Sequence, residues 1–71
     1  MIRKFHLWRD RDETGVSGTG KIAEGCLFSN GWVSLAFLTQ VSSLAFYFCI
    51  EDVEAIHGHK GSTRVVFEDA K

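Results

Sequence analysis

The sequence predicts one small, mainly β domain with five short strands and a short helix before the last strand. Three observations lead to this fold class. Several short segments alternate apolar and polar residues, which is the period of a β-strand. Residues 30–31 are an Asn-Gly pair between two apolar runs, which is typical of a β-hairpin. The chain has 71 residues, of which 45% are hydrophobic, so residues 1–71 suffice for a single small core.

The first part of the chain predicts two strands joined by a polar loop. Residues 2–9 alternate, with Phe5 and Leu7 on the same face, which indicates the first strand. Residues 10–20 are polar and rich in glycine, so we expect a loop there. The apolar run over residues 21–28 predicts the second strand.

The Asn30-Gly31 pair predicts a type I′ turn that joins the second strand to a third strand over residues 32–39. After a polar break at residues 40–43, residues 44–50 predict a fourth strand. Alternation assigns one face of these two strands to the core, and the expected core residues are Val33, Leu35 and Phe37, then Leu44, Phe46, Phe48 and Ile50.

Residues 51–57 predict a short helix, because Val53 and Ile56 are three residues apart and acidic residues stand near its start. Gly58 follows as a candidate C-cap, and residues 63–68 predict a fifth strand. This order, with a long first loop and a helix before the last strand, matches a five-stranded SH3-like small barrel. An OB-like barrel is the alternative, and it would place the helix between the third and fourth strands.

The charge composition argues against a general electrostatic grip on nucleic acid. Lys and Arg total 8 against 9 Asp and Glu, whereas phosphate binding needs a clear surplus of basic residues. The basic residues nearest the N-terminus accompany Trp8, and they are Arg3, Lys4, Arg9 and Arg11. A small nucleic-acid-binding regulator is therefore an alternative function, with nucleic acid less favoured than other partners.

No charged residue occurs between positions 25 and 50. Residues 31–50 are long enough to span a bilayer as a helix, so a small membrane protein is a weaker alternative. Turn residues at the start of this stretch, polar residues at its midpoint and its alternating pattern all oppose a spanning helix. We therefore expect no membrane association.

The outward faces of the third and fourth strands are also expected to be uncharged, which is unusual for a solvated surface. Burial against a second copy of the chain explains such a face better than solvent does. The sequence therefore predicts a homo-oligomer, and the expected interface residues are Trp32, Ala36, Leu38 and Tyr47.

The glycine-rich segment over residues 15–20 resembles an anion cradle, because it offers backbone N–H groups and hydroxyls. It is not a Walker loop, since no Ser or Thr follows Gly20-Lys21. Functional residues often lie on such loops. The expected ligand-binding residues are Ser17, Gly18, Thr19 and Lys21, together with Trp8 and Arg9 of the preceding strand.

The sequence supports neither catalysis nor a metal site. It carries no recognisable nucleophile–base arrangement, so we expect a protein that is not an enzyme and has no catalytic residues. His57 and His59 do not complete a zinc ligand set, and no Cys-x-x-Cys pair supports them. We therefore predict no metal and no cofactor.

Cys26 and Cys49 both stand in apolar runs, and we interpret them as buried free thiols, with pairing possible if their strands lie side by side. Charged residues within positions 3–10 interrupt any apolar leader. A reducing, cytoplasmic location is the expectation that follows.

Two segments carry a family resemblance: TGVSGTG at residues 14–20 and IEDVEAIHGH at residues 50–59. Together they resemble a group of short uncharacterised proteins of bacteriophages and bacteria. The resemblance implies a phage or prophage origin and no particular activity. By analogy with other small phage proteins, we expect a non-enzymatic binding protein in counter-defence, which sequesters a nucleotide ligand or blocks a host protein.

Overall fold

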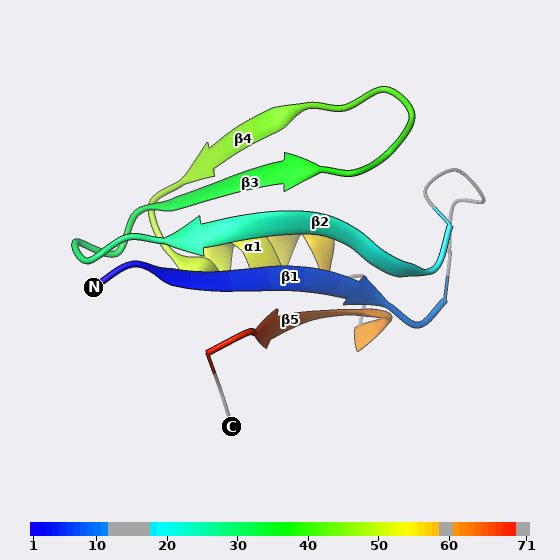
Figure 1. Cartoon of the computed structure of the whole chain (residues 1–71). Coiled ribbons are helices and arrows are strands. Elements are labelled where there is room, and N and C mark those ends of the chain that lie inside the picture. Colours follow the sequence, from blue (N-terminus) through cyan, green and yellow to red (C-terminus); the bar gives the residue numbers. More distant parts are fainter. Residues whose placement is uncertain (12–17, 59–60, 70–71) are drawn as a thin grey trace.

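The computed structural model describes residues 1–11, 18–58 and 61–69. In this part of the chain, five strands and one α-helix follow one another (Figure 1). Their bounds are β1 (Arg3–Arg9), β2 (Gly20–Leu27), β3 (Val33–Phe37), β4 (Leu44–Tyr47), α1 (Ile50–His57) and β5 (Thr63–Phe67). The predicted elements are all present, and the fourth strand ends earlier than expected because Ile50 begins the helix.

The strands form one antiparallel sheet in the order β4-β3-β2-β1-β5. This confirms the predicted mainly β class with a helix before the last strand. The helix lies between β4 and β5 in the chain, which does not fit the OB-like alternative. β4 and β5 are at opposite edges of the sheet, so backbone hydrogen bonds do not close it into a complete barrel.

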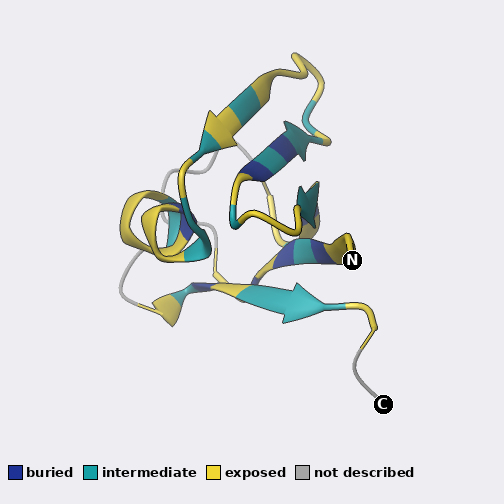
Figure 2. Ribbon diagram, turned by 90° about the vertical axis from the view of Figure 1, so that its left-hand side faces the viewer, coloured by how far each residue is buried: buried dark blue, intermediate teal, exposed yellow. Residues whose placement is uncertain are grey.

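Helix α1 packs on one face of the curved sheet, which we call the inner face (Figure 2). Acidic residues in its first turn suit the positive end of the helix dipole. Gly58 is the C-cap with right-handed backbone angles, and its N–H donates to the Glu54 carbonyl at 2.9 Å. Helix α1 covers the inner face between the two edge strands, β4 and β5, which do not pair with each other.

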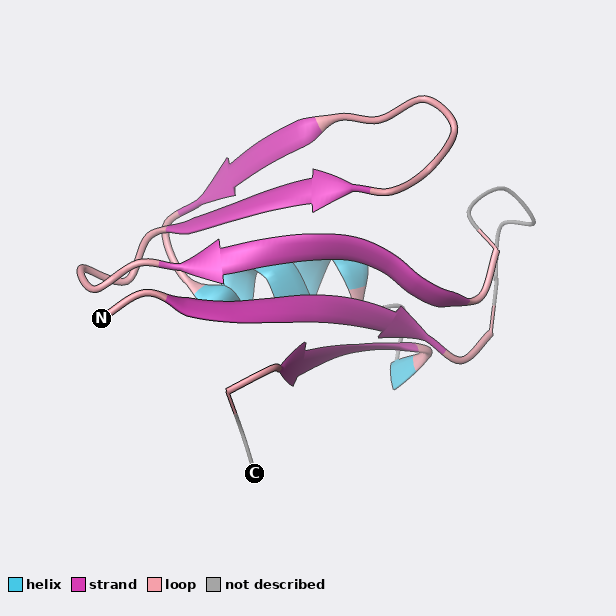
Figure 3. Cartoon of the chain, viewed as in Figure 1, coloured by secondary structure: helices cyan, strands magenta, loops and turns pink. Residues whose placement is uncertain are grey.

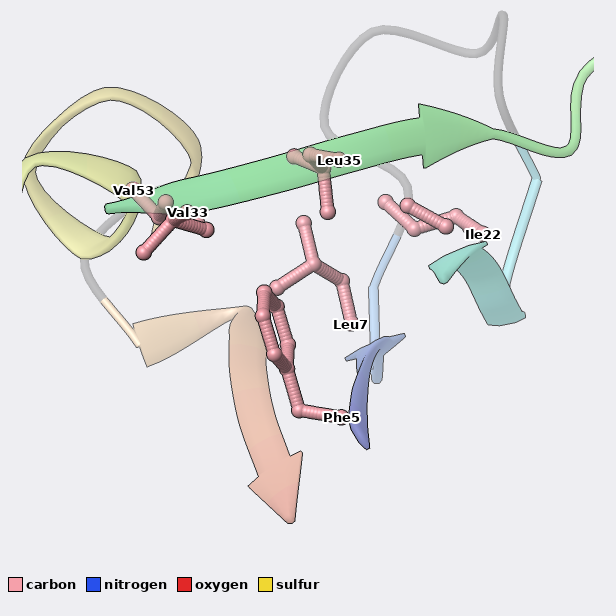
Figure 4. Close-up of a cluster of buried hydrophobic side chains, with 7 residues drawn as sticks. Phe5, Leu7, Ile22, Val33, Leu35 and Val53 are labelled. Carbon is pink, nitrogen blue, oxygen red and sulfur yellow. The ribbon is translucent and has the colours of Figure 1, made fainter. Parts of the chain in front are cut away.

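The core fills the space between the inner face and α1 (Figure 4). Alternation along each strand sends every second side chain there, and Val53 reaches it from the helix. The fully or nearly fully buried apolar residues are Phe5, Leu7, Ile22, Ala23, Val33, Leu35 and Val53. This result confirms the predicted inward faces of the first and third strands.

An irregularity in β2 lets two consecutive residues enter the core. Leu7 pairs with Ala23 but Trp8 pairs with Lys21, so Ile22 is the extra residue of a β-bulge. Ile22 and Ala23 are both buried as a result.

The predicted orientation of the fourth strand was wrong. Val33 pairs with Tyr47 and Leu35 pairs with Ala45, which places Ala45 and Tyr47 on the inner face. The expected core residues Leu44, Phe46 and Phe48 are exposed instead, because a shift of one residue reverses every side chain of a strand. The Tyr47 hydroxyl is 2.6 Å from His57 Nε2, so its polar group is satisfied beneath the sheet.

The turn after β2 differs from the predicted type I′ geometry. The Gly31 N–H donates to the Phe28 carbonyl, and the Phe28 N–H donates to the Trp32 carbonyl, which closes a three-residue loop. Gly31 adopts the left-handed conformation with φ +94°, and the Trp32 N–H donates to Asn30 Oδ1 at 3.1 Å. The Asn-Gly pair thus marks a hairpin, in its longer variant that ends on a left-handed residue.

Residues 31–50, the segment weighed above as a membrane span, contain the β3–β4 hairpin. Within residues 1–11, 18–58 and 61–69, none of the helical structure has the length and apolar character needed to cross a bilayer.

Gly25 of β2 is required because atoms of the two neighbouring strands, β1 and β3, approach it closely. A Cβ atom there would lie 2.7 Å from Phe5 Cε1 and 2.7 Å from the Ser34 carbonyl oxygen. We predict that Gly25→Ala lowers the free energy of unfolding by about 1–3 kcal/mol, the usual cost of overpacking. Urea denaturation measures this value, with Cys26→Ala on the opposite face as the control; equal midpoints for wild type and Gly25→Ala would contradict the prediction.

Candidate functional site

The predicted glycine-loop site is only partly visible. Ser17 lies outside the described residues, and Gly18 has a left-handed backbone with φ +79°. Thr19 is exposed, but the Lys21 ammonium lies 2.9 Å from Glu24 and 3.7 Å from Glu68. These carboxylates raise the pKa of Lys21, chiefly through the Glu24 hydrogen bond, and they compete with any anionic ligand.

The two β1 residues expected to assist this loop point to opposite sides of the sheet. Trp8 is partly exposed on the face away from α1. Arg9 is 4% exposed, and its Nε donates to Thr63 Oγ1 at 2.9 Å. Arg9 is therefore committed to joining β1 and β5 rather than to a surface ligand.

The face of the sheet away from α1, which we call the outer face, is turned toward the viewer in Figure 3. Its β1, β2 and β5 half is charged, and ion pairs connect residues that are distant in the chain. His6 Nδ1 donates to Glu68 Oε2 at 3.0 Å, and Arg64 Nε donates to Asp10 Oδ2 at 3.1 Å. At one end, Arg3 pairs with Asp69 at 2.8 Å.

The β3–β4 half of the outer face carries exposed apolar side chains. We call this set the apolar ridge, and its members are Trp32, Leu38, Leu44, Phe46 and Phe48. Leu44 is 64% exposed, Phe46 65% and Phe48 72%. The rings of Trp32 and Phe48 lie 4.5 Å apart between centroids, which holds both side chains in place. β4 accordingly shows exposed positions in Figure 2.

A groove of about 370 Å³ separates the two halves of the outer face. Register places the small residues Cys26, Ser34 and Ala36 there, and small side chains leave a hollow. Leu44 of the apolar ridge contributes to the lining, which is completed by Phe5, Gly25 and the charged residues Lys4, Glu24 and Glu68. The groove thus offers apolar contact beside fixed charges.

The predicted interface residues do not all share one surface. Trp32 and Leu38 are exposed members of the apolar ridge, and Ala36 lines the groove. Tyr47 lies on the inner face, where burial raises its pKa and His57 bonds to its hydroxyl. Tyr47 is therefore not part of the outer surface, because its strand has the opposite orientation to the one expected.

Sequence reasoning missed three residues of the outer surface: Leu44, Phe46 and Phe48. Both orientations of the fourth strand put apolar residues on both faces, so hydrophobicity did not decide between them. The signal that could have decided the orientation of the fourth strand is the presence of both Tyr47 and His57. A tyrosine can point into the core when its hydroxyl has a polar partner such as a histidine.

Neither cysteine forms a disulfide, and both are half-buried rather than buried. Cys26 lines the groove, whereas Cys49 precedes α1. His59, one of the two histidines weighed as metal ligands, falls outside the described residues. Over the described part of the chain, no three His, Cys, Asp or Glu side chains come close enough together to hold a metal ion.

Ion pairs on the charged half lower the pKa values of two carboxyl groups. The hydrogen bond from His6, with Lys21 and Lys4 nearby, holds the pKa of Glu68 below its ordinary value of 4.5. The hydrogen bond from Arg3 holds the pKa of Asp69 below 3.8. A carboxyl whose pKa is lower in the folded state stabilises the fold above its unfolded pKa and loses that contribution as pH falls.

We predict that the free energy of unfolding falls as pH drops below about 4.5, the ordinary pKa of Glu68. Glu68→Gln should be less stable at neutral pH and should show a shallower loss in acid. Urea denaturation across this pH range, followed by tryptophan fluorescence, measures both. Glu51→Gln on α1 is the control, and parallel pH profiles for wild type and Glu68→Gln would refute the assignment.

A family model with the description Acb5 phage protein matches residues 2–69, nearly the whole chain. This match agrees with the resemblance to small phage proteins predicted from the sequence. No curated protein and no solved structure matches the chain.

Proposed function

The chain belongs to the Acb5 phage protein family, and we propose that it is a non-enzymatic binding protein that blocks a host protein in counter-defence. The observation that carries this proposal is the apolar ridge beside the groove. Large contiguous apolar patches on a protein surface are characteristic of sites that bind another protein. Here Leu44 and Phe46 lie on β4, and the other members of the patch flank β3 and β4.

The apolar ridge has the composition of a protein-binding surface. Trp32 and Phe48 are large, rigid side chains, and aromatic anchors of this kind dominate the energy of many interfaces. Removing their exposed surface from water is favourable by about 25 cal/mol per Å². The adjoining groove, at about 370 Å³, has room for an inserted side chain of the target.

The charged half supports specificity rather than affinity. Protein interfaces commonly have an apolar centre and a polar rim. Glu24, Glu68 and Lys4 border the groove and form such a rim on one side of the apolar ridge. A host target that presents an apolar side chain flanked by polar or charged groups fits this arrangement. Binding over the functional surface of that target is enough to block it.

Sequestration of a nucleotide is the second candidate. The groove volume lies within the range of small-molecule sites, roughly 300–1,000 Å³. Lys4 and Ser34 offer donors there, but Glu24 and Glu68 repel phosphate. Lys21 of the glycine-loop site is also occupied by carboxylates. Electrostatics therefore supports a protein target better than a nucleotide.

The nucleic-acid-binding alternative has less support still. Arg3, Lys21 and Arg64 each form an ion pair with a carboxylate, so phosphate must displace an existing partner. Binding to phosphate would weaken steeply with added salt, whereas docking of an apolar surface would change little.

We predict that Phe48→Glu weakens capture of the host target at least tenfold, because a buried carboxylate replaces an aromatic anchor. The tagged protein is expressed in host cells, and co-purified proteins are quantified by mass spectrometry. The same cells are infected with a phage, and plaque counts measure how well the protein protects the phage from host defence. We expect this protection to fall together with capture of the host target. Phe48 is largely exposed, so the variant should fold.

Ile56→Glu is the matched control, since Ile56 is 59% exposed on α1, away from the outer face. It should retain both capture and protection. Equal capture and protection by wild type and Phe48→Glu would overturn the proposal. A nucleotide found by native mass spectrometry in place of a protein target would favour the second candidate.

A further inference from the structure

Among the described strands, β4 is an edge strand, and none of them pairs with the far side of its backbone. In the sheet order it is the terminal strand, with β3 as its neighbour (Figure 1). The Phe37 N–H donates to the Ser43 carbonyl at 2.9 Å, which sets the phase of the β3–β4 ladder. Because hydrogen-bonded pairs alternate in an antiparallel ladder, Ala45 and Tyr47 face β3, and the N–H and C=O groups of Leu44 and Phe46 face outward.

β4 is short, at four residues, but its edge carries none of the other features that usually prevent strands from pairing between molecules. Natural edges carry charged residues, proline or bulges. The chain has no proline, residues 25–50 carry no charge, and the β3–β4 register has no shift. The other edge, β5, carries Arg64 and is followed by Glu68 and Asp69. β4 is therefore the less protected edge of the two.

We propose that two copies of the chain pair through β4, antiparallel about a two-fold axis, so that their sheets become continuous. Leu44 of one copy lies opposite Phe46 of the second copy, and the two Ala45 residues meet at the axis. This register is favoured because both edge-facing residues of each strand then form hydrogen-bonded pairs. The inference goes beyond the proposed function, because it concerns the backbone edge of β4. Leu44 and Phe46 belong to the apolar ridge, and pairing at the edge leaves their outer face turned toward a host target.

The side chains at this edge suit a second copy. Leu44 and Phe46 are each more than 60% exposed, and they would pack as Leu–Phe pairs on the outer face. The N–H and C=O groups of the two edges add main-chain hydrogen bonds, which supply affinity when strands pair between molecules. An uncharged segment also meets its own copy without repulsion.

Charge substitutions test both the dimer and its register. We expect the wild type to be a dimer in sedimentation-velocity ultracentrifugation over a dilution series. Leu44→Glu or Phe46→Lys should each raise the dissociation constant at least tenfold, because a charge then faces an apolar side chain. In the double variant, and in a mixture of the two single variants, Glu at 44 faces Lys at 46 and pairing should return.

Circular dichroism verifies that each variant folds, and both positions are exposed enough to accept a charge. Ile56→Lys on α1 is the control and should remain a dimer. A monomeric wild type overturns the proposal, as does a dimer that neither single variant weakens. A double variant that stays monomeric overturns the register in which residue 44 faces residue 46. In a register that pairs residue 44 with residue 44 of the second copy, the two introduced Glu side chains face each other and repel. None of these outcomes depends on whether Phe48→Glu loses a host target.

Discussion

Packing of one short helix against the inner face of the sheet is the interaction on which the rest of this structure depends. β4 and β5 do not pair with each other, so the apolar side chains of the strands need another cover. Val53 supplies it at the centre of α1, and the Tyr47–His57 hydrogen bond ties the end of the helix back to β4. A domain of this size has little core to spare. It is therefore built around one cluster of side chains, with all its layers meeting there.

This one-sided core explains why the outer face has such an uneven composition. Side chains that point away from α1 do not belong to the core cluster, so core packing does not set their polarity. On β1, β2 and β5 many of them are charged, and ion pairs connect different parts of the sheet. On the β3–β4 hairpin they are aliphatic and aromatic. This division follows the boundary between β2 and β3, and it supports the binding role proposed above for the apolar ridge.

The sequence predicts most of the fold because its local signals agree with one another. Phe5 and Leu7, then Val33 and Leu35, alternate with polar or small residues and are buried as expected. The fourth strand is ambiguous because neither of its faces is polar, and its orientation depends on Tyr47 meeting His57 ten residues later. The sites are harder to predict than the strands. The burial of Arg9 against Thr63 and the neutralisation of Lys21 by Glu68 both join segments that are distant in the chain.

Buried and exposed residues are separated on the β3–β4 hairpin, and this separation has an evolutionary consequence. The buried residues are Val33 and Leu35, and the exposed ones are Leu44, Phe46 and Phe48. Residues of the first kind hold the fold, and substitutions among them create cavities that a small domain tolerates poorly. Residues of the second kind are exposed, and their replacement changes stability little. A lineage of such proteins can therefore explore new surfaces on a single hairpin while inheriting an unchanged scaffold. Under the function proposed above, adaptation to a changing host requires a few substitutions in one short segment rather than a new fold.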